Sequence, residues 1–230
     1  MQRILPLFAV LMLSSGVAEA RPGFYLGLGF GASSANGESV PYDAFEQPGR
    51  FTLSGGTFST ELNGGLGTQF RLGFNIEGYA AVEAMAQAHA SNLTDESRRN
   101  WAAHWHLGPR IYPLWHWRAE LPEKLQRLEP SIFFGWGGSW QVYNPTGNSE
   151  LGWSGLGTFR FGLGVEYFVL SYMKLGLDYY HVSAPYDTFI FNFSDGISGG
   201  VDSEQASASF NQVILTMNFH FGVEDKPIAY

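Results

Sequence analysis

The chain has 230 residues, no cysteine and a formal net charge of −8, and 45% of its residues are hydrophobic. The acidic balance argues against nucleic acid as a partner, and the lack of cysteine excludes disulfides and a cysteine-linked lipid anchor. Glycine (29), phenylalanine (19), tyrosine (11) and tryptophan (7) are abundant, which fits short strands with rings on one face and small residues on the other.

Residues 1–20 have the features of a secretory signal peptide. Arg3 precedes the apolar run 4–13, and the small residues at the two ends of the tripeptide 18–20 form an A-x-A cleavage site. The run is too short for a permanent membrane helix, so we expect export followed by removal of this segment. No later apolar run reaches about 18 residues, which excludes a helical membrane protein.

Regular alternation of apolar residues with polar or small ones predicts β-strands. The clearest case is the segment 157–168, in which one face carries only apolar side chains and the other combines glycine with Arg160 and Glu166. The same pattern predicts eight strands in total, over residues 24–32, 65–75, 79–90, 101–112, 132–143, 157–168, 173–183 and 210–221.

Short and long connections alternate between these predicted strands. The segments 76–78 and 169–171 are tight turns, and the segments 33–64, 91–100, 144–156 and 184–209 are longer, polar loops. This alternation is typical of a barrel with short periplasmic turns and long extracellular loops. The connection 115–129 is the exception, and we predict a short amphipathic helix within it, over 122–128.

The apolar face of each predicted strand is almost free of charge over about nine to eleven residues, the length that a tilted strand needs to cross hydrocarbon. A charge on this face would cost about 2–4 kcal/mol at the bilayer midplane, whereas a strand of a soluble sandwich has no reason to avoid one. The sequence therefore predicts an all-β fold, an eight-stranded antiparallel up-and-down transmembrane β-barrel. It covers residues 21–222 and is followed by an extension, 223–230.

Several charges fall on the inward face of the predicted strands. They are Arg71, Glu83, Arg110, Arg160, Glu166, Lys174 and Asp178. Counting from the turns places Arg71 opposite Glu83, with Arg110 close to both. The same counting places Glu166 opposite Lys174, and Arg160 diagonal to Asp178. These charges suit either a gated ion path or a plug of salt bridges, and we favour the plug because eight strands leave room for side chains but little else.

Three histidines form a candidate metal site near the outer rim. His89, His104 and His106 all face inward, and imidazole is a good ligand for divalent transition metals. No carboxylate lies in register with them unless Asp95 or Glu96 folds in from its loop. We therefore expect polar rim residues here, with neither a metal nor another cofactor.

His181 and Ser183 point outward at the end of the predicted strand 173–183. The pair resembles part of the motif of outer-membrane lipid A deacylases, which implies a hydrolase acting on lipid. The acids that might orient the histidine are Asp187, Asp195 and Glu204. An Ala-Pro pair follows Ser183 in place of the asparagine of that family, so we expect no enzymatic activity.

The order and spacing of several segments resemble the OmpA/OmpX-like outer-membrane β-barrel superfamily. These segments are FYLGLGFGA, GTQFRLGFNIEGYAAVEA, GPRIYP, LEPSIFFGWG, FGLGVEYFVLSYMKLGLDYYH and NFHF. The resemblance implies a barrel in the outer membrane of a Gram-negative bacterium, surrounded by outer-membrane lipid and lipopolysaccharide. It also implies insertion by the barrel-assembly machinery through an aromatic-ended last strand. We expect the protein to be a monomer and to belong to the porin family.

Two features depart from the superfamily pattern. The chain continues past Phe221 to Tyr230, and it contains no peptidoglycan-binding domain, so a tether to the cell wall is not implied. The remaining expectation is a structural or surface-interaction role through long loops. The segment 35–59, with its exposed Tyr42, Phe45 and Phe51, is the main candidate, and a small channel or a lipid A-modifying hydrolase is the alternative.

Overall fold

The computed structural model describes most of the chain after residue 22. The described ranges are 23–37, 39–42, 45–47, 51–53, 56–59, 62–76, 78–92, 99–144, 149–170, 172–193 and 198–221. The predicted signal peptide, 1–20, and the C-terminal extension, 223–230, lie outside these ranges.

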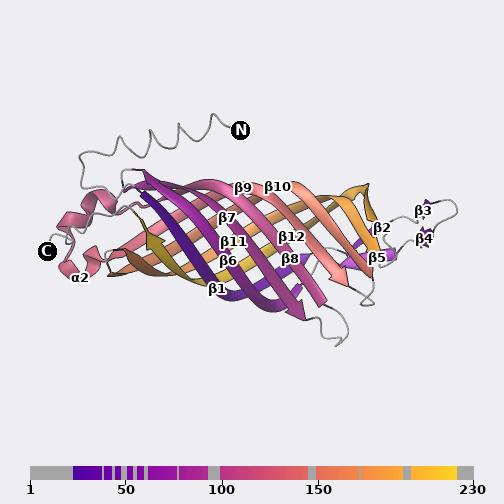
Figure 1. Ribbon diagram of the computed structural model, residues 1–230, viewed down its shortest axis with the longest axis horizontal. Helices are drawn as coiled ribbons and strands as arrows, with labels where there is room; N and C mark the ends of the chain where they lie inside the picture. Colours follow the sequence, from indigo (N-terminus) through magenta and orange to yellow (C-terminus); the bar gives the residue numbers. More distant parts are fainter. Residues whose placement is uncertain are drawn as a thin grey trace.

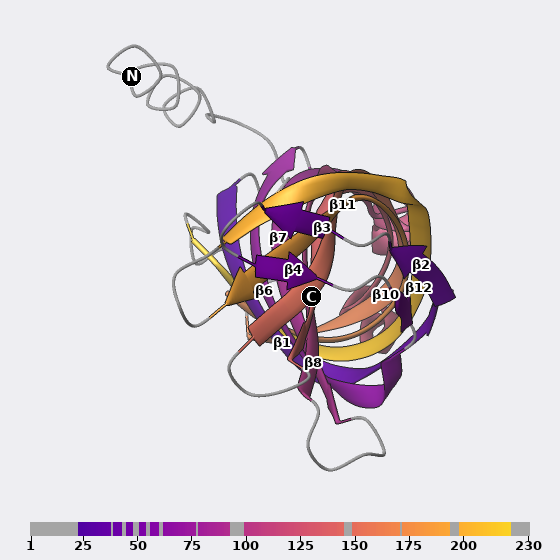
Figure 2. The ribbon, with the colours of Figure 1, turned by 90° about the vertical axis from the view of Figure 1, so that its right-hand side faces the viewer.

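Eight antiparallel strands form a closed barrel, seen from the side in Figure 1 and along its axis in Figure 2. In chain order they are β1 (Gly23–Gly37), β6 (Leu62–Ile76), β7 (Ala80–Asn92), β8 (Arg99–Ile111), β9 (Leu128–Asn144), β10 (Ser149–Leu170), β11 (Met173–Phe193) and β12 (Ser198–His220). Each strand pairs with its neighbours in the chain, and β1 closes the ring on β12, with Tyr25 opposite His220. The predicted eight-stranded barrel is confirmed.

The two faces of the strands have the predicted polarity. Leu163, Leu177 and Leu215 are exposed on the outside of the barrel, whereas Arg160 and Asp178 on the same sheet are buried inside it. A sheet with this arrangement presents hydrocarbon to its surroundings and hides its charges, which is the polarity of a transmembrane barrel.

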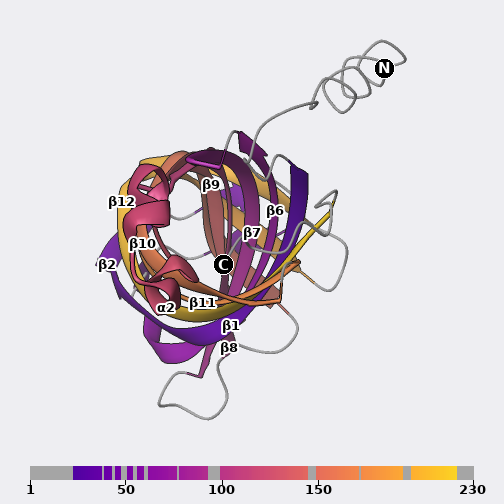
Figure 3. The ribbon, with the colours of Figure 1, turned by 90° about the vertical axis from the view of Figure 1, so that its left-hand side faces the viewer.

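The barrel has two different ends. At the turn end lie the connections between β6 and β7 and between β10 and β11, together with the 3-10 helix η1 (Trp115–Glu120) and the helix α2 (Glu123–Gln126), visible in Figure 3. The predicted short helix is present as α2, and neither described helix is long and apolar enough to cross a membrane. At the loop end, two small ladders join β2 (Ser39–Tyr42) to β5 (Gly56–Ser59) and β3 (Phe45–Gln47) to β4 (Phe51–Leu53). The side chains of Tyr42, Phe45 and Phe51 lie outside the described part of the structure.

Three strands continue much further toward the loop end than the sequence predicts. β10, β11 and β12 contain 22, 21 and 23 residues, so most of the predicted loops 144–156 and 184–209 is strand, and that prediction is wrong. The reason is an exchange of faces in two strands: the buried side chains change from odd to even positions between Trp153 and Thr158 on β10, and from even to odd positions between Tyr186 and Phe189 on β11. The ladder is irregular at both places, between Leu156 and Thr158 and between Tyr186 and Thr188, so a search for strict alternation stops there. At the first irregularity, Gly157 has a φ of +88°, a conformation that favours glycine.

Candidate functional site

Among the residues whose side chains the structure describes, eight charged ones are buried in the lumen, all between 0 and 6% exposed. Four are cations and four are carboxylates: Arg71, Arg110, Arg160 and Lys174, and Glu83, Glu129, Glu166 and Asp178. The set is therefore neutral overall. This balance matters because a buried ion is tolerated only where opposite charge and hydrogen bonds replace water.

Asp178, Arg71 and Arg110 form the centre of this network. Asp178 on β11 pairs with Arg71 on β6 and with Arg110 on β8, the latter at 3.4 Å between Oδ1 and Nη1. Arg110 Nε donates to Glu83 Oε1 at 2.6 Å, and Arg71 Nη1 lies 3.1 Å from Glu166 and 3.7 Å from Glu83. The Arg71, Glu83 and Arg110 side chains thus come together as the sequence predicts.

Two tyrosines that the sequence analysis left without a role complete this centre. Tyr180 accepts hydrogen bonds from Arg71 and Arg110 at 3.1 and 2.8 Å, and its hydroxyl donates to Asp178 at 2.8 Å. Tyr25 donates to Glu83. Both residues fall on the inward face of their predicted strands, so a buried hydroxyl in need of partners was the signal that pointed to them.

A second group of charges lies closer to the turn end. Lys174 pairs with Glu129 and, at 3.2 Å, with Glu166, which also accepts a hydrogen bond from Asn218 at 2.8 Å. The ammonium group lies over the Phe168 ring, 4.5 Å from its centroid. Glu129 is missing from the predicted network because it lies at the start of β9, in a segment predicted to be a connection.

The strand register differs from the predicted one by two residues at both turns. Ile76 pairs with Ala80, so Glu83 lies opposite Gly73 and not opposite Arg71. The ion pair still forms because the arginine is long enough to reach the diagonal neighbour.

At the second turn, Glu166 lies opposite Gly176, and its contact with Lys174 is again diagonal. Arg160 lies opposite Val182, not diagonal to Asp178 as predicted, and its hydrogen bonds go to Gln87 and Gln69. The position of the turn is the cause, because the counting assumed a turn over 169–171, whereas β10 runs on to Leu170, which pairs with Met173.

The three candidate metal ligands lie inside the barrel, in its loop-end half. His89, His104 and His106 are buried, with ring centroids 5.3 Å apart for the first pair and 6.1 Å apart for the second. Within the described ranges, no group of three His, Cys, Asp or Glu residues is arranged to hold a metal ion. Asp95 and Glu96 lie outside these ranges.

His181 and Ser183 are on the outer face of β11, where Ser183 is exposed and His181 is half-buried. The Oδ1 atom of Asn211 lies 3.1 Å from His181 Nδ1 and accepts a hydrogen bond from Tyr179 at 2.8 Å. Because an amide oxygen only accepts, Nδ1 must carry the proton, and Nε2 is the basic nitrogen of the neutral ring. The partner of His181 is therefore an amide, not one of the predicted acids.

The three predicted acids are accounted for separately. Asp187 accepts a hydrogen bond from the neighbouring Thr188 at 3.0 Å. Asp195 and the side chain of Glu204 lie outside the described part of the chain. Among described residues, Asn211 is thus the group that orients the imidazole.

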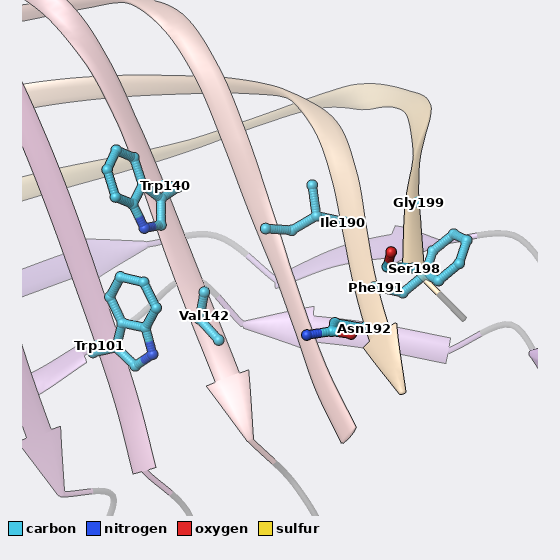
Figure 4. Close-up of a pocket in the computed structure, with 8 residues that line it drawn as sticks. All are labelled: Trp101, Trp140, Val142, Ile190, Phe191, Asn192, Ser198 and Gly199. Carbon is cyan, nitrogen blue, oxygen red and sulfur yellow. The ribbon is translucent and has the colours of Figure 1, made fainter. Parts of the chain in front are cut away.

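A separate hollow of about 370 Å³ lies at the loop end (Figure 4). It is lined by Trp101, Trp140, Val142, Ile190, Phe191, Asn192, Ser198 and Gly199. Trp101 pairs with Val142 across β8 and β9, and Gly152 on β10 separates Val142 from Ile190. Because this glycine has no side chain, an apolar recess lies between the side chains of Val142 and Ile190. The recess is distinct from the ion-pair network.

Comparisons with known proteins agree on the fold. The family model of the outer membrane protein beta-barrel domain matches residues 4–221. Neisserial surface protein A is 9% identical with a TM-score of 0.55, over 86% of this chain and 97% of that one. OprG from Pseudomonas aeruginosa is 10% identical with a TM-score of 0.49, over 89% and 98% of the two chains. The likeness to Neisserial surface protein A shows a common fold alone, and no curated protein matches the sequence.

Proposed function

Since the chain belongs to the outer membrane protein β-barrel domain family, we propose that it is a non-conducting barrel of the outer membrane with a structural or surface-interaction role. The protein reaches the membrane by signal-peptide export in a Gram-negative bacterium and is inserted as a monomer by the barrel-assembly machinery. It is surrounded there by outer-membrane lipid and lipopolysaccharide. Closure of the sheet by β1 and β12 supports a monomer, because the ring needs no second copy.

One observation carries the non-conducting part of this proposal. Arg160 Nη2 on β10 donates to Gln69 Oε1 on β6 at 3.0 Å, and these two strands are on opposite sides of the eight-stranded ring. A direct hydrogen bond across the full width of the lumen places side chains at its centre at that level, which supports a closed lumen. The ion pairs of Arg71, Arg110 and Asp178 fill the lumen nearer the turn end. Trp153, Tyr186 and Phe189 are buried toward the loop end.

The surface part of the proposal rests on the loop end. The long strands β10, β11 and β12 have about twice the length that a tilted strand needs to cross hydrocarbon. The excess chain projects beyond the membrane and carries the recess beside Trp101 and Ile190. A rigid wall of this kind presents a defined surface, whereas a loop would first have to be ordered at an entropic cost.

Planar-bilayer recording tests the closed lumen. We expect no unitary current steps from the purified barrel in concentrated potassium chloride, because the charges in the lumen are paired and buried. A conducting porin inserted under the same conditions serves as the positive control. Regular steps that change in size or ion selectivity on Arg71→Ala or Glu83→Gln would replace this proposal with a small channel.

The hydrolase alternative is favoured by one observation, the hydrogen bond that fixes the His181 tautomer. With Nδ1 donating to Asn211, the basic Nε2 belongs to an outward-facing ring two residues from the exposed Ser183. Histidine oriented by an amide does serve as a base in some hydrolases. This alternative places a nucleophile beside lipid without any use of the lumen.

Mass spectrometry of lipid A separates the two functions. We expect identical lipid A masses from cells that express the wild-type barrel and cells that express Ser183→Ala, because the proposed role needs no nucleophile. Ser209→Ala on the paired strand position is the matched control. Loss of an acyl chain in the wild type that is abolished by Ser183→Ala, but not by Ser209→Ala, would establish the hydrolase.

A further inference from the structure

Arg160 differs from the other three buried cations because it has no carboxylate partner. Its guanidinium donates to Gln87 Oε1 at 2.7 Å and to Gln69 Oε1 at 3.0 Å, and it lies 3.5 Å from the centroid of the Tyr180 ring. No carboxylate of a described residue lies within ion-pairing distance of it, although it is fully buried. Amide oxygens and a ring face supply partial charge only, so the excess carboxylate that makes the set of eight charges neutral does not contact Arg160 directly.

A chain of hydrogen bonds runs from Arg160 to His89. Gln87 accepts from Arg160 through Oε1 and donates through Nε2 to Gln212 Oε1. Since the Gln212 oxygen is an acceptor, its nitrogen donates to His89 Nε2, which lies 2.7 Å away. The proton of the neutral imidazole must then be on Nδ1. In each of these hydrogen bonds the residue nearer to Arg160 is the donor. The series ends at His89 Nδ1, a donor that makes no hydrogen bond.

Other donors in the same layer of the lumen are also unpartnered. They are Arg160 Nε, Gln69 Nε2, and one N–H on each of His104 and His106, whose ring nitrogens make no hydrogen bond. The three imidazoles form a row with ring centroids 5.3 and 6.1 Å apart, and Gln87 and Gln212 connect its first member, His89, to Arg160. His89 packs closely against Gly67, because a Cβ on this glycine would lie only 2.9 Å from Nδ1. Buried donors that outnumber their acceptors are costly unless an acceptor joins them.

We propose that a small monovalent anion of the halide class binds in the lumen between Arg160 and the three histidines. A single negative charge matches the single unpaired cation, and the unpartnered N–H groups supply the hydrogen bonds that replace its hydration. The anion must be small because side chains fill the interior of an eight-stranded barrel. Water accepts the same hydrogen bonds but depends on no added halide, so the two occupants are distinguishable by experiment.

Two measurements on the whole purified protein test the site together. In detergent, at constant sodium concentration, replacing gluconate by chloride is expected to raise the unfolding temperature by about 3–6 °C per tenfold increase in chloride above its dissociation constant. Crystals grown in sodium bromide are expected to show an anomalous scattering peak beside Arg160 and His104. If either the halide-specific shift or the peak is missing, water fills this layer and the proposal is wrong.

Matched variants locate the effect. Arg160→Gln is expected to abolish both the chloride-dependent shift and the bromide peak, because it removes the charge that the anion balances. Lys174→Gln removes a cation that already has carboxylate partners, so it is expected to lower the unfolding temperature but to keep the chloride dependence. If Arg160→Gln does not fold, the two wild-type measurements still decide the question. A chloride dependence that survives in a folded Arg160→Gln protein would contradict the site.

Discussion

Replacing Arg71 with methionine is expected to lower the free energy of unfolding by about 3–5 kcal/mol, as expected when one partner of a buried ion pair is removed. Arg71 contacts Glu83, Glu166 and Asp178, and all four side chains are buried. The variant leaves four carboxylates facing three cations in the lumen. Methionine retains most of the apolar stem, so the lost charge dominates the effect. Urea unfolding in detergent micelles, followed by tryptophan fluorescence, measures the change.

The matched control for this variant is Arg127→Met. Arg127 is half-buried at the C-terminal end of α2, where solvent screens its charge, so its replacement is expected to cost less than about 1 kcal/mol. A double-mutant cycle of Arg71→Met with Asp178→Asn is expected to be non-additive because the two side chains share one network. Equal losses for Arg71→Met and Arg127→Met would show that the lumen charges do not act as a unit.

Leu215→Arg is expected to destabilise the barrel by about 2–4 kcal/mol in phospholipid vesicles. Leu215 is 66% exposed on the outer face of β12, between the exposed Val213 and Met217. It lies in the middle of the predicted membrane-crossing segment 210–221, so we expect it near the hydrocarbon midplane. The cost arises because the guanidinium must lose its hydration or pull water and headgroups into the bilayer. Equilibrium unfolding in vesicles, with the folded fraction read from electrophoretic mobility, gives the value.

Leu170→Arg provides the same chemical change at a different depth. Leu170 is also exposed, but it ends β10 at the turn end, where an arginine reaches the aqueous interface. Its replacement is expected to cost about 0–1 kcal/mol. Similar costs at the two positions would mean that Leu215 does not face the hydrocarbon core.

The sequence was sufficient to predict the eight strands and their faces because hydrocarbon imposes a simple rule. Where the alternation is unbroken, apolar residues such as Leu163 and Leu215 point outward, and no charged residue was predicted on this outer face. The rule contains no information on turn length. The predicted pairing of Arg71 with Glu83 therefore missed by two residues, and the contact formed only because an arginine spans the diagonal.

Arg160 shows where prediction between neighbouring strands fails. Counting across a turn compares β10 with β11, but the partners of Arg160 are on β6 and β7, across the lumen. The distances between side chains on opposite sides of the lumen depend on the curvature of the whole sheet. This curvature cannot be derived from the register between two neighbouring strands. The hydroxyl of Tyr180 was missed for the same reason, since it joins arginines from two strands that are not its neighbours.

Near Gly157 on β10 and near Asp187 on β11, the inward-facing and outward-facing positions of the strand are exchanged. On the turn-end side of them, leucines point out and charges point in. On the loop-end side, Trp153 and Phe189 point in, with ring centroids 5.2 Å apart, while Asp187 and Asn192 are exposed. The same continuous strands thus obey the solvent rule of a membrane protein at one end and that of a water-soluble protein at the other. The exchange of faces in these strands marks where the surrounding medium changes from lipid to water.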